Sequence, residues 1–184
     1  MGYIHIYTGN AKGKTTCAVG LTVRALGAGM RVAFCQFDKG FEGKNEHYHE
    51  RFILRTLPNL DLFFFGEERM MPDGKFRFQN NDADFSQAAQ GLAKARELVS
   101  QNKYNMIVLD EIVTCILTKL LQPKELLDLV GFYRTTAQSA PELVLTGRGA
   151  FPELIEQADL VTDMTLIKHY WYAGNIPPRK GIDF

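Results

Sequence analysis

Residues 8–16, with the sequence TGNAKGKTT, have the residue types and spacing of a phosphate-binding loop. They match the pattern G-x-x-x-x-G-K-[ST] except that Thr8 stands at the first glycine. In such loops successive backbone N–H groups surround the phosphates, the lysine reaches over them and the following hydroxyl binds Mg²⁺. A tight turn with a surface lysine is the alternative. The predicted nucleotide-binding residues are Thr8, Gly9, Asn10, Ala11, Lys12, Gly13, Lys14, Thr15 and Thr16.

Two carboxylates, Asp110 and Glu111, follow the apolar run 106–109. Such a run predicts a buried strand that delivers both residues to the sheet edge where ligands collect. In P-loop proteins a carboxylate at this place holds Mg²⁺, directly or through water. Successive residues of an extended strand point to opposite sides. We therefore expect one carboxylate to order the Mg²⁺ shell and the other to position a reacting group or cap the next segment. A strand-end aspartate that only caps a helix is the alternative.

Arg148 lies between Gly147 and Gly149, directly after the apolar run 142–146. Its guanidinium stays charged and can bind two phosphate oxygens at once. Residues 38–40 follow another predicted strand, 31–37, and are site candidates by position. Arg24 lies on the helix predicted after the loop, where its position favours a surface charge over a nucleotide contact.

A parallel sheet would bring these groups together. The runs 3–7, 31–37, 106–111 and 142–146 are typical of strands covered on both faces, and a helix over 14–26 completes a βαβ unit. That helix is apolar nearly all round, so we expect it to be buried. Right-handed crossovers would leave the loops at the carboxyl ends of the strands. We also predict helices over 83–100, 123–138 and 152–158, strands over 53–57, 60–65 and 160–167, and a long loop over 67–82.

The composition argues against a nucleic-acid-binding protein and against a membrane protein. The chain has 184 residues, of which 46% are hydrophobic, with 21 basic and 21 acidic side chains, as for one α/β domain. No basic run suggests a nucleic-acid partner. The three cysteines are isolated, as in a reducing compartment. No signal peptide precedes the first predicted strand and no apolar run suits a membrane span, so we expect a cytoplasmic protein.

The aromatic tail, 168–184, is too irregular for an element and should pack back as a cover over the site.

The motifs together resemble those of the P-loop-containing ATP:corrinoid adenosyltransferases, which make the Co–C bond of adenosylcobalamin. Thr8 agrees with that family, whereas Ala11 stands where members usually have glycine and needs a φ that an L-residue tolerates. The resemblance rests on TGNAKGKTT (8–16), RALGAG (24–29), VAFCQFDKG (32–40), VLDEI (108–112), LTGRG (145–149) and IKHYWYAG with GIDF (167–184).

The resemblance implies a three-layer, RecA-like P-loop fold: an α/β domain over 1–184 with a mostly parallel sheet of about five to six strands flanked by helices. It implies transfer of the 5′-deoxyadenosyl group of ATP to the Co(I) centre of a corrinoid, with release of triphosphate. ATP is then co-substrate, Mg²⁺ the cofactor and the corrinoid the substrate, with a homodimer and a flavodoxin-like reductant as partners. The N-terminal extension that helps cover the corrinoid in better-known members is expected to be absent or replaced.

The resemblance also implies residue roles. The catalytic residues would be Lys14, Arg148 and Glu111. The metal would be bound by Thr15, Asp110 and Glu111. ATP lies in the reverse direction across the loop in this family, which brings Asn10 towards the nucleoside and Arg24 into the site. Phe76 or Phe78 would border the lower face of the cobalt.

Two other readings fit the same residues. A P-loop kinase or ATPase acting at the γ-phosphate could use Asp110, Glu111 and Arg148 equally well. A non-enzymatic, nucleotide-gated binding module of RecA-like fold would need only the loop.

Overall fold

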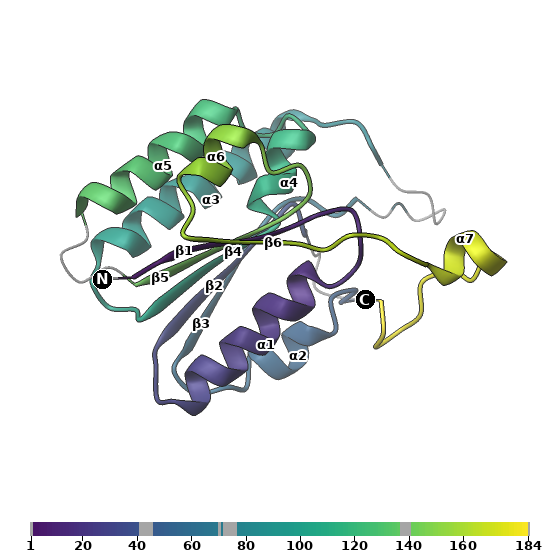
Figure 1. The fold of residues 1–184 in the computed structure, drawn as a ribbon, viewed down its shortest axis with the longest axis horizontal. Helices are drawn as coiled ribbons and strands as arrows, with labels where there is room; N and C mark the ends of the chain where they lie inside the picture. The colour runs from purple at the N-terminus through teal and green to yellow at the C-terminus, as the bar shows by residue number, and fades with distance from the viewer. Residues whose placement is uncertain (1, 41–45, 70, 72–76, 137–140, 184) are drawn as a thin grey trace.

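The computed structural model describes residues 2–40, 46–69, 71, 77–136 and 141–183 (Figure 1). Its centre is a six-stranded sheet in the order β3-β2-β4-β5-β1-β6, in which every pairing is parallel. The strands are β1 (Ile4–Thr8), β2 (Val32–Phe37), β3 (Leu60–Phe65), β4 (Met106–Asp110), β5 (Glu142–Thr146) and β6 (Leu160–Asp163). The helices are α1 (Lys14–Gly27), α2 (Glu50–Leu54), α3 (Asp82–Ser100), α4 (Ile112–Leu117), α5 (Pro123–Thr136), α6 (Pro152–Glu156) and α7 (Tyr170–Gly174).

Helices cover both faces of the sheet. Helices α1 and α2 lie on one face, and α3, α4, α5 and α6 lie on the other (Figure 1). The larger apolar core lies on the α3–α5 side and includes Ile107, Leu109 and Leu129, whereas the smaller one joins α1 to Phe34 and Val108. Strands β2 and β4 are buried along their whole length, which explains their unbroken apolar runs. The predicted three-layer α/β fold is confirmed.

The strand order decides which strand ends meet. Strand β5 lies between β4 and β1, and β2 pairs with β4 on its other side. The carboxyl ends of β1, β2, β4 and β5 therefore form one continuous edge, at which the phosphate loop, Lys39, Asp110 and Arg148 follow their strands.

Four local predictions differ from the structure. Residues 50–54 form helix α2 instead of a strand over 53–57, because so short an apolar run is compatible with either structure. Helix α1 is buried on one face only, and its Val23 is 52% exposed, because the sheet covers a single side of it. The tail contains the short helix α7, and helix α4 was not predicted.

Other boundaries are shifted by a few residues. Strand β6 is an edge strand as predicted but ends at Asp163 instead of residue 167. Helix α5 ends at Thr136, and residues 137 and 138 of its predicted span lie outside the described residues. Within the described part of the chain, no helix has the length and apolar character needed to cross a membrane.

Candidate functional site

The phosphate loop connects β1 to α1, as predicted, and two of its glycines are required by its path. Gly9 and Gly13 have φ values of 102° and 124°, which L-residues rarely adopt. A Cβ on Gly9 would lie 2.2 Å from Asp163 Oδ1, because the end of β6 passes directly against the loop. Ala11 is not among the described residues with positive φ, and its N–H donates to Met164 O at 2.9 Å. The alanine is therefore tolerated without strain.

Thr8, at the position of the motif's first glycine, uses its side chain in the site. It is buried, and its Oγ1 accepts a hydrogen bond from Ala150 N at 3.3 Å. Ala150 follows the Gly147–Gly149 turn that carries Arg148. The threonine therefore links the phosphate loop to the arginine turn, a contact that glycine could not make.

Lys14 is folded back onto its own loop. Its Nζ donates to Gly9 O at 2.9 Å and to Ala11 O at 2.8 Å. Burial lowers the pKa of Lys14, as does the Arg148 charge, while Glu111 and Asp110 oppose the shift. A bound polyphosphate would supply the counter-charge that this ammonium lacks.

Asp110 is the centre of a buried polar cluster. Its Oδ1 accepts hydrogen bonds from Thr15 Oγ1 at 2.9 Å and from Thr146 Oγ1 at 2.7 Å. Its Oδ2 lies 2.7 Å from Lys39 Nζ. Burial by itself would raise the pKa of Asp110, but the Lys39 charge and these hydrogen bonds outweigh it and lower the pKa. Burial would likewise lower the pKa of Lys39, yet Asp110 and Glu111 raise it. Both groups are therefore charged.

Glu111 has a different environment, because the strand ends at Asp110. Glu111 has a left-handed φ of 64°, and its N–H donates to Thr146 Oγ1 at 2.9 Å. Its side chain accepts a hydrogen bond from Thr114, whose Oγ1 also accepts from Arg148 N at 2.9 Å. The carboxylate therefore lies at the cavity wall and is linked through one hydroxyl to the arginine turn.

Gly147 makes this link possible. Its φ is 143°, and a Cβ there would lie 2.4 Å from Thr114 N. Only glycine allows the turn to pass so close to α4.

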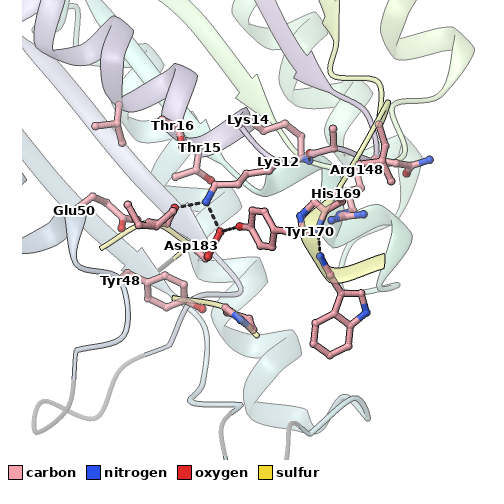
Figure 2. Close-up of a pocket in the computed structure, with 18 of the residues that line it drawn as sticks. Lys12, Lys14, Thr15, Thr16, Tyr48, Glu50, Arg148, His169, Tyr170 and Asp183 are labelled. Carbon is pink, nitrogen blue, oxygen red and sulfur yellow. Dashed lines mark hydrogen bonds and ion pairs between the residues drawn. The ribbon is translucent and has the colours of Figure 1, made fainter. Parts of the chain in front are cut away.

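The loop faces a cavity of about 860 Å³ (Figure 2). One wall consists of the phosphate loop with Lys39, Glu111 and Arg148, and the opposite wall comes from the tail. The other side chains around it include Tyr48, His49, Glu50, Leu166, His169, Tyr170, Trp171, Tyr172, Ile176 and Asp183.

The tail is attached to the loop by polar contacts. Lys12 Nζ donates to Ile182 O and to the Asp183 carboxylate, which also accepts from Tyr170 Oη (Figure 2). The Arg179 N–H donates to Asp183 Oδ2 at 2.9 Å. The hydrogen bonds from Lys12 and Tyr170 lower the pKa of Asp183. Residues of the tail between 169 and 183 therefore line one side of the cavity.

Most of the predicted site residues meet at this cavity. Asn10, Ala11, Lys12, Gly13, Lys14, Thr15, Thr16, Glu111 and Arg148 line it, and Asp110 lies directly behind Thr15. Arg24 does not line it and is exposed on the last turn of α1. Phe78 is 85% exposed and outside the lining, and Phe76 lies outside the described residues.

Several site residues were missed by sequence reasoning or were candidates by position alone. Lys39 was a candidate by position alone, and Thr146 and Thr114 carried no signal beyond their place at a strand end or after the carboxylates. Tyr48 and Glu50 come from a segment without a clear pattern. Only the strand order shows that these residues meet.

The donors at the end of β4 suit Mg²⁺. The Thr15 hydroxyl and the Asp110 carboxylate are hard oxygen ligands 2.9 Å apart. Among the described residues no group of three or more histidine, cysteine, aspartate or glutamate side chains could hold a metal by itself. In nucleotide enzymes, Mg²⁺ is usually held by one or two protein ligands together with water and substrate phosphates.

Comparisons with known proteins show the family of this chain. The family described as ATP:corrinoid adenosyltransferase BtuR/CobO/CobP matches residues 1–184. The chain is 33% identical over 183 residues to the corrinoid adenosyltransferase of Pseudomonas aeruginosa, covering 100% of this chain and 84% of that protein. It is 28% identical over 194 residues to the corrinoid adenosyltransferase of Escherichia coli K12, covering 100% and 86%.

A solved structure shows the same fold. The flagellar accessory protein FlaH of Methanocaldococcus jannaschii superposes with a TM-score of 0.55 at 16% identity, over 87% of this chain and 69% of that one. The family match over residues 1–184 and the relative that is 33% identical show that the chain is a transferase and belongs to the ATP:corrinoid adenosyltransferase family.

Proposed function

We propose that this protein transfers the 5′-deoxyadenosyl group of ATP to the Co(I) centre of a corrinoid and releases inorganic triphosphate. One observation carries the proposal: the phosphate loop, Arg148 and the aromatic tail residues line a single cavity. A polyphosphate and a large, mostly apolar co-substrate can therefore meet in one place. Within the family, ATP-dependent adenosylation of a corrinoid is the general reaction.

The chemistry would need positioning and charge stabilisation from the protein. The Co(I) electron pair attacks C5′ of ATP, the Co–C bond forms, and the C5′–O5′ bond breaks with its electrons leaving on triphosphate. Cobalt is thereby oxidised from Co(I) to Co(III). Lys12, Lys14 and Arg148 would stabilise the charge of the leaving triphosphate, as would the loop N–H groups. The departing phosphate oxygen leaves as an anion, so the step requires no general base.

Thr15 and Asp110 would hold Mg²⁺ in this reaction, with Glu111 at the adjoining wall. When bound, the ion supplies further positive charge to the triphosphate. Asp110 is already ionised and oriented by Thr146 at 2.7 Å, so no rearrangement of its carboxylate is needed.

The apolar side of the site would receive the corrinoid. We assign Trp171 and Tyr172 of the tail to the wall next to it, and Phe76 or Phe78 to the face below the cobalt. Displacing the lower cobalt ligand with an apolar surface favours reduction to Co(I). A flavodoxin-like protein would deliver the electron.

We also propose that residues 1–184 act as a single domain, with 168–184 covering the site, and that the enzyme is a cytoplasmic homodimer. Free Cys17, Cys35 and Cys115 agree with a reducing compartment. Light scattering after size-exclusion chromatography gives the oligomeric state directly.

The product of ATP decides the reaction. The enzyme is mixed with chemically reduced Co(I) corrinoid, MgCl₂ and ATP, and the nucleotide and phosphate products are separated by ion chromatography. We expect triphosphate and adenosylcorrinoid in equal amounts. ADP as the product would indicate a γ-phosphate kinase or ATPase instead. Unchanged Co(I) absorbance in a single turnover would indicate a nucleotide-gated binding module.

A further inference from the structure

Lys39 lies between the two side chains that are suited to bind Mg²⁺. Its Nζ is 2.7 Å from Asp110 Oδ2 and 3.1 Å from Thr15 Oγ1, and Thr15 itself donates to Asp110 at 2.9 Å. The three side chains thus form a closed triangle of hydrogen bonds. A cation in contact with both oxygens would need the space that this ammonium group occupies.

The backbone around Lys39 is held firmly. Asp38 before it has a left-handed φ of 51°, which turns the chain at the end of β2. The Lys39 carbonyl accepts a hydrogen bond from the buried Arg51 Nη2 at 2.7 Å. On the other side, a Cβ on Gly40 would lie 1.9 Å from the Glu67 carbonyl carbon. The lysine is therefore directed at Asp110 by packing on both sides.

Lys39 is the counter-ion of Asp110. It is 9% exposed, and its Nζ lies 5.2 Å from the centre of the Tyr48 ring. A buried Asp110 carboxylate without a counter-ion would be strongly disfavoured, and Lys39 is the cation in direct contact with it. Gln36 adds only a neutral donor, at 3.4 Å from Asp110 Oδ2. Lys39 therefore neutralises this carboxylate.

We infer that Lys39 holds Thr15 and Asp110 together and excludes free divalent metal until a nucleotide arrives. The inference rests on the proposed Mg²⁺–nucleotide site and adds a gating role for this lysine. Triphosphate would make the exchange favourable in two ways, since its oxygens complete the metal's ligands and its charge offers the displaced ammonium a new partner. Lys39 would then join Lys12 and Lys14 at the phosphates.

The test measures metal binding without nucleotide and without corrinoid. Mn²⁺ is titrated into the nucleotide-free protein and the free ion is followed by electron paramagnetic resonance. Lys39→Met should bind one Mn²⁺ roughly tenfold or more tightly than wild type, because a positive charge next to the site has been removed. Lys39→Arg, which keeps the charge, should behave as wild type. Lys94→Met on α3, where Lys94 pairs with Glu97, is the matched control.

A double variant locates the ion. Asp110→Asn combined with Lys39→Met should abolish the gained Mn²⁺ binding. Equal Mn²⁺ affinity in wild type and Lys39→Met would overturn the inference, as would tight binding by the nucleotide-free wild type.

A second measurement needs no variant to fold. The ammonium ¹⁵N–¹H signals of the lysines are recorded on the wild-type protein. A buried, hydrogen-bonded Lys39 ammonium should give a slowly exchanging signal that is unaffected by MgCl₂ alone and shifts when a non-hydrolysable ATP analogue is added with Mg²⁺. A signal that moves with Mg²⁺ alone contradicts the inference. Neither measurement uses a corrinoid. Both would therefore still test the role of Lys39 if the protein proved not to transfer an adenosyl group.

Discussion

Lys12 of the phosphate loop forms an ion pair with Asp183, which lies 171 residues further along the chain. The carboxylate is held in place by Tyr170 Oη and by the Arg179 N–H as well. A lysine suited to bind phosphate is thus in contact with a carboxylate of the tail. ATP and Asp183 would compete for the same ammonium.

Asp183→Asn should therefore strengthen ATP binding. The pair is partly exposed and such pairs are weak, so we expect a gain of roughly two- to fivefold in affinity. The gain should shrink at high salt, because screening weakens the wild-type ion pair. Isothermal titration at low and high ionic strength provides the check, with Asp128→Asn on α5 as control. Weaker binding by Asp183→Asn would show that the tail contact assists the nucleotide.

Lys14→Ala should nearly abolish turnover while the fold is retained. Losing one positioned cation at the leaving group lowers kcat/KM by roughly 10²–10³-fold. Its Nζ contacts are to Gly9 and Ala11 carbonyls within the loop, so the sheet is not involved. Steady-state kinetics should be compared with those of Lys124→Ala, whose side chain is 82% exposed on α5. A near-wild-type kcat/KM would remove the loop lysine from the mechanism.

Arg148→Lys should reduce kcat more than it changes the KM for ATP. Lysine keeps the charge but loses the planar pair of donors that binds two phosphate oxygens. The turn itself should persist, because its bond to Thr114 Oγ1 comes from the Arg148 backbone N–H. Unchanged melting temperatures of Arg148→Lys and Arg148→Ala would establish that point. If both variants keep the wild-type kcat, Arg148 does not act on the leaving group.

Phe78→Ala should impair Co(II) corrinoid reduction and leave ATP binding intact. The side chain is 85% exposed and outside the nucleotide cavity, so its removal should not destabilise the fold. Losing an aromatic contact of roughly 0.5–1.5 kcal/mol corresponds to a loss of about 2–12-fold in corrinoid affinity. Spectroscopic titration with Co(II) corrinoid and MgATP measures this. Phe52→Ala on α2 serves as the control, and equal losses of ATP and corrinoid binding would refute the assignment.

The free energy of unfolding should decrease at high pH because of the buried Tyr133 hydroxyl. Burial raises the pKa of Tyr133 to about 12, and its hydroxyl donates to Pro141 O at 2.8 Å. Between pH 10 and about 12 the unfolded chain releases this proton and the folded chain keeps it, so the free energy of unfolding decreases as pH rises. Below pH 10 the full contribution is present.

Tyr133→Phe isolates that effect. It should be less stable than wild type below pH 10 by about 1 kcal/mol for the lost hydrogen bond, and the gap should narrow above it. Urea unfolding at a series of pH values gives both curves. Parallel curves would mean that Tyr133 does not titrate differently in the two states.

Much of this protein is determined by local sequence. The apolar run before Thr8, the glycines of the loop and the carboxylates after residue 109 predict a strand, a phosphate turn and a strand-end acid, because side-chain period and turn chemistry are short-range properties. Helix α2 was not predicted from the sequence, because a short apolar run does not distinguish a strand from a helix.

The tertiary structure alone decided which distant groups meet. Strand β2 lies beside β4, and this brings Lys39 into contact with Asp110, 71 residues further along the chain. The path of the tail places Asp183 on Lys12 in the same way. Arg24, on the helix that starts from the loop, remains outside the cavity because the helix carries it away from the sheet edge. Strand order and tail path depend on packing over the whole chain, which no local pattern contains.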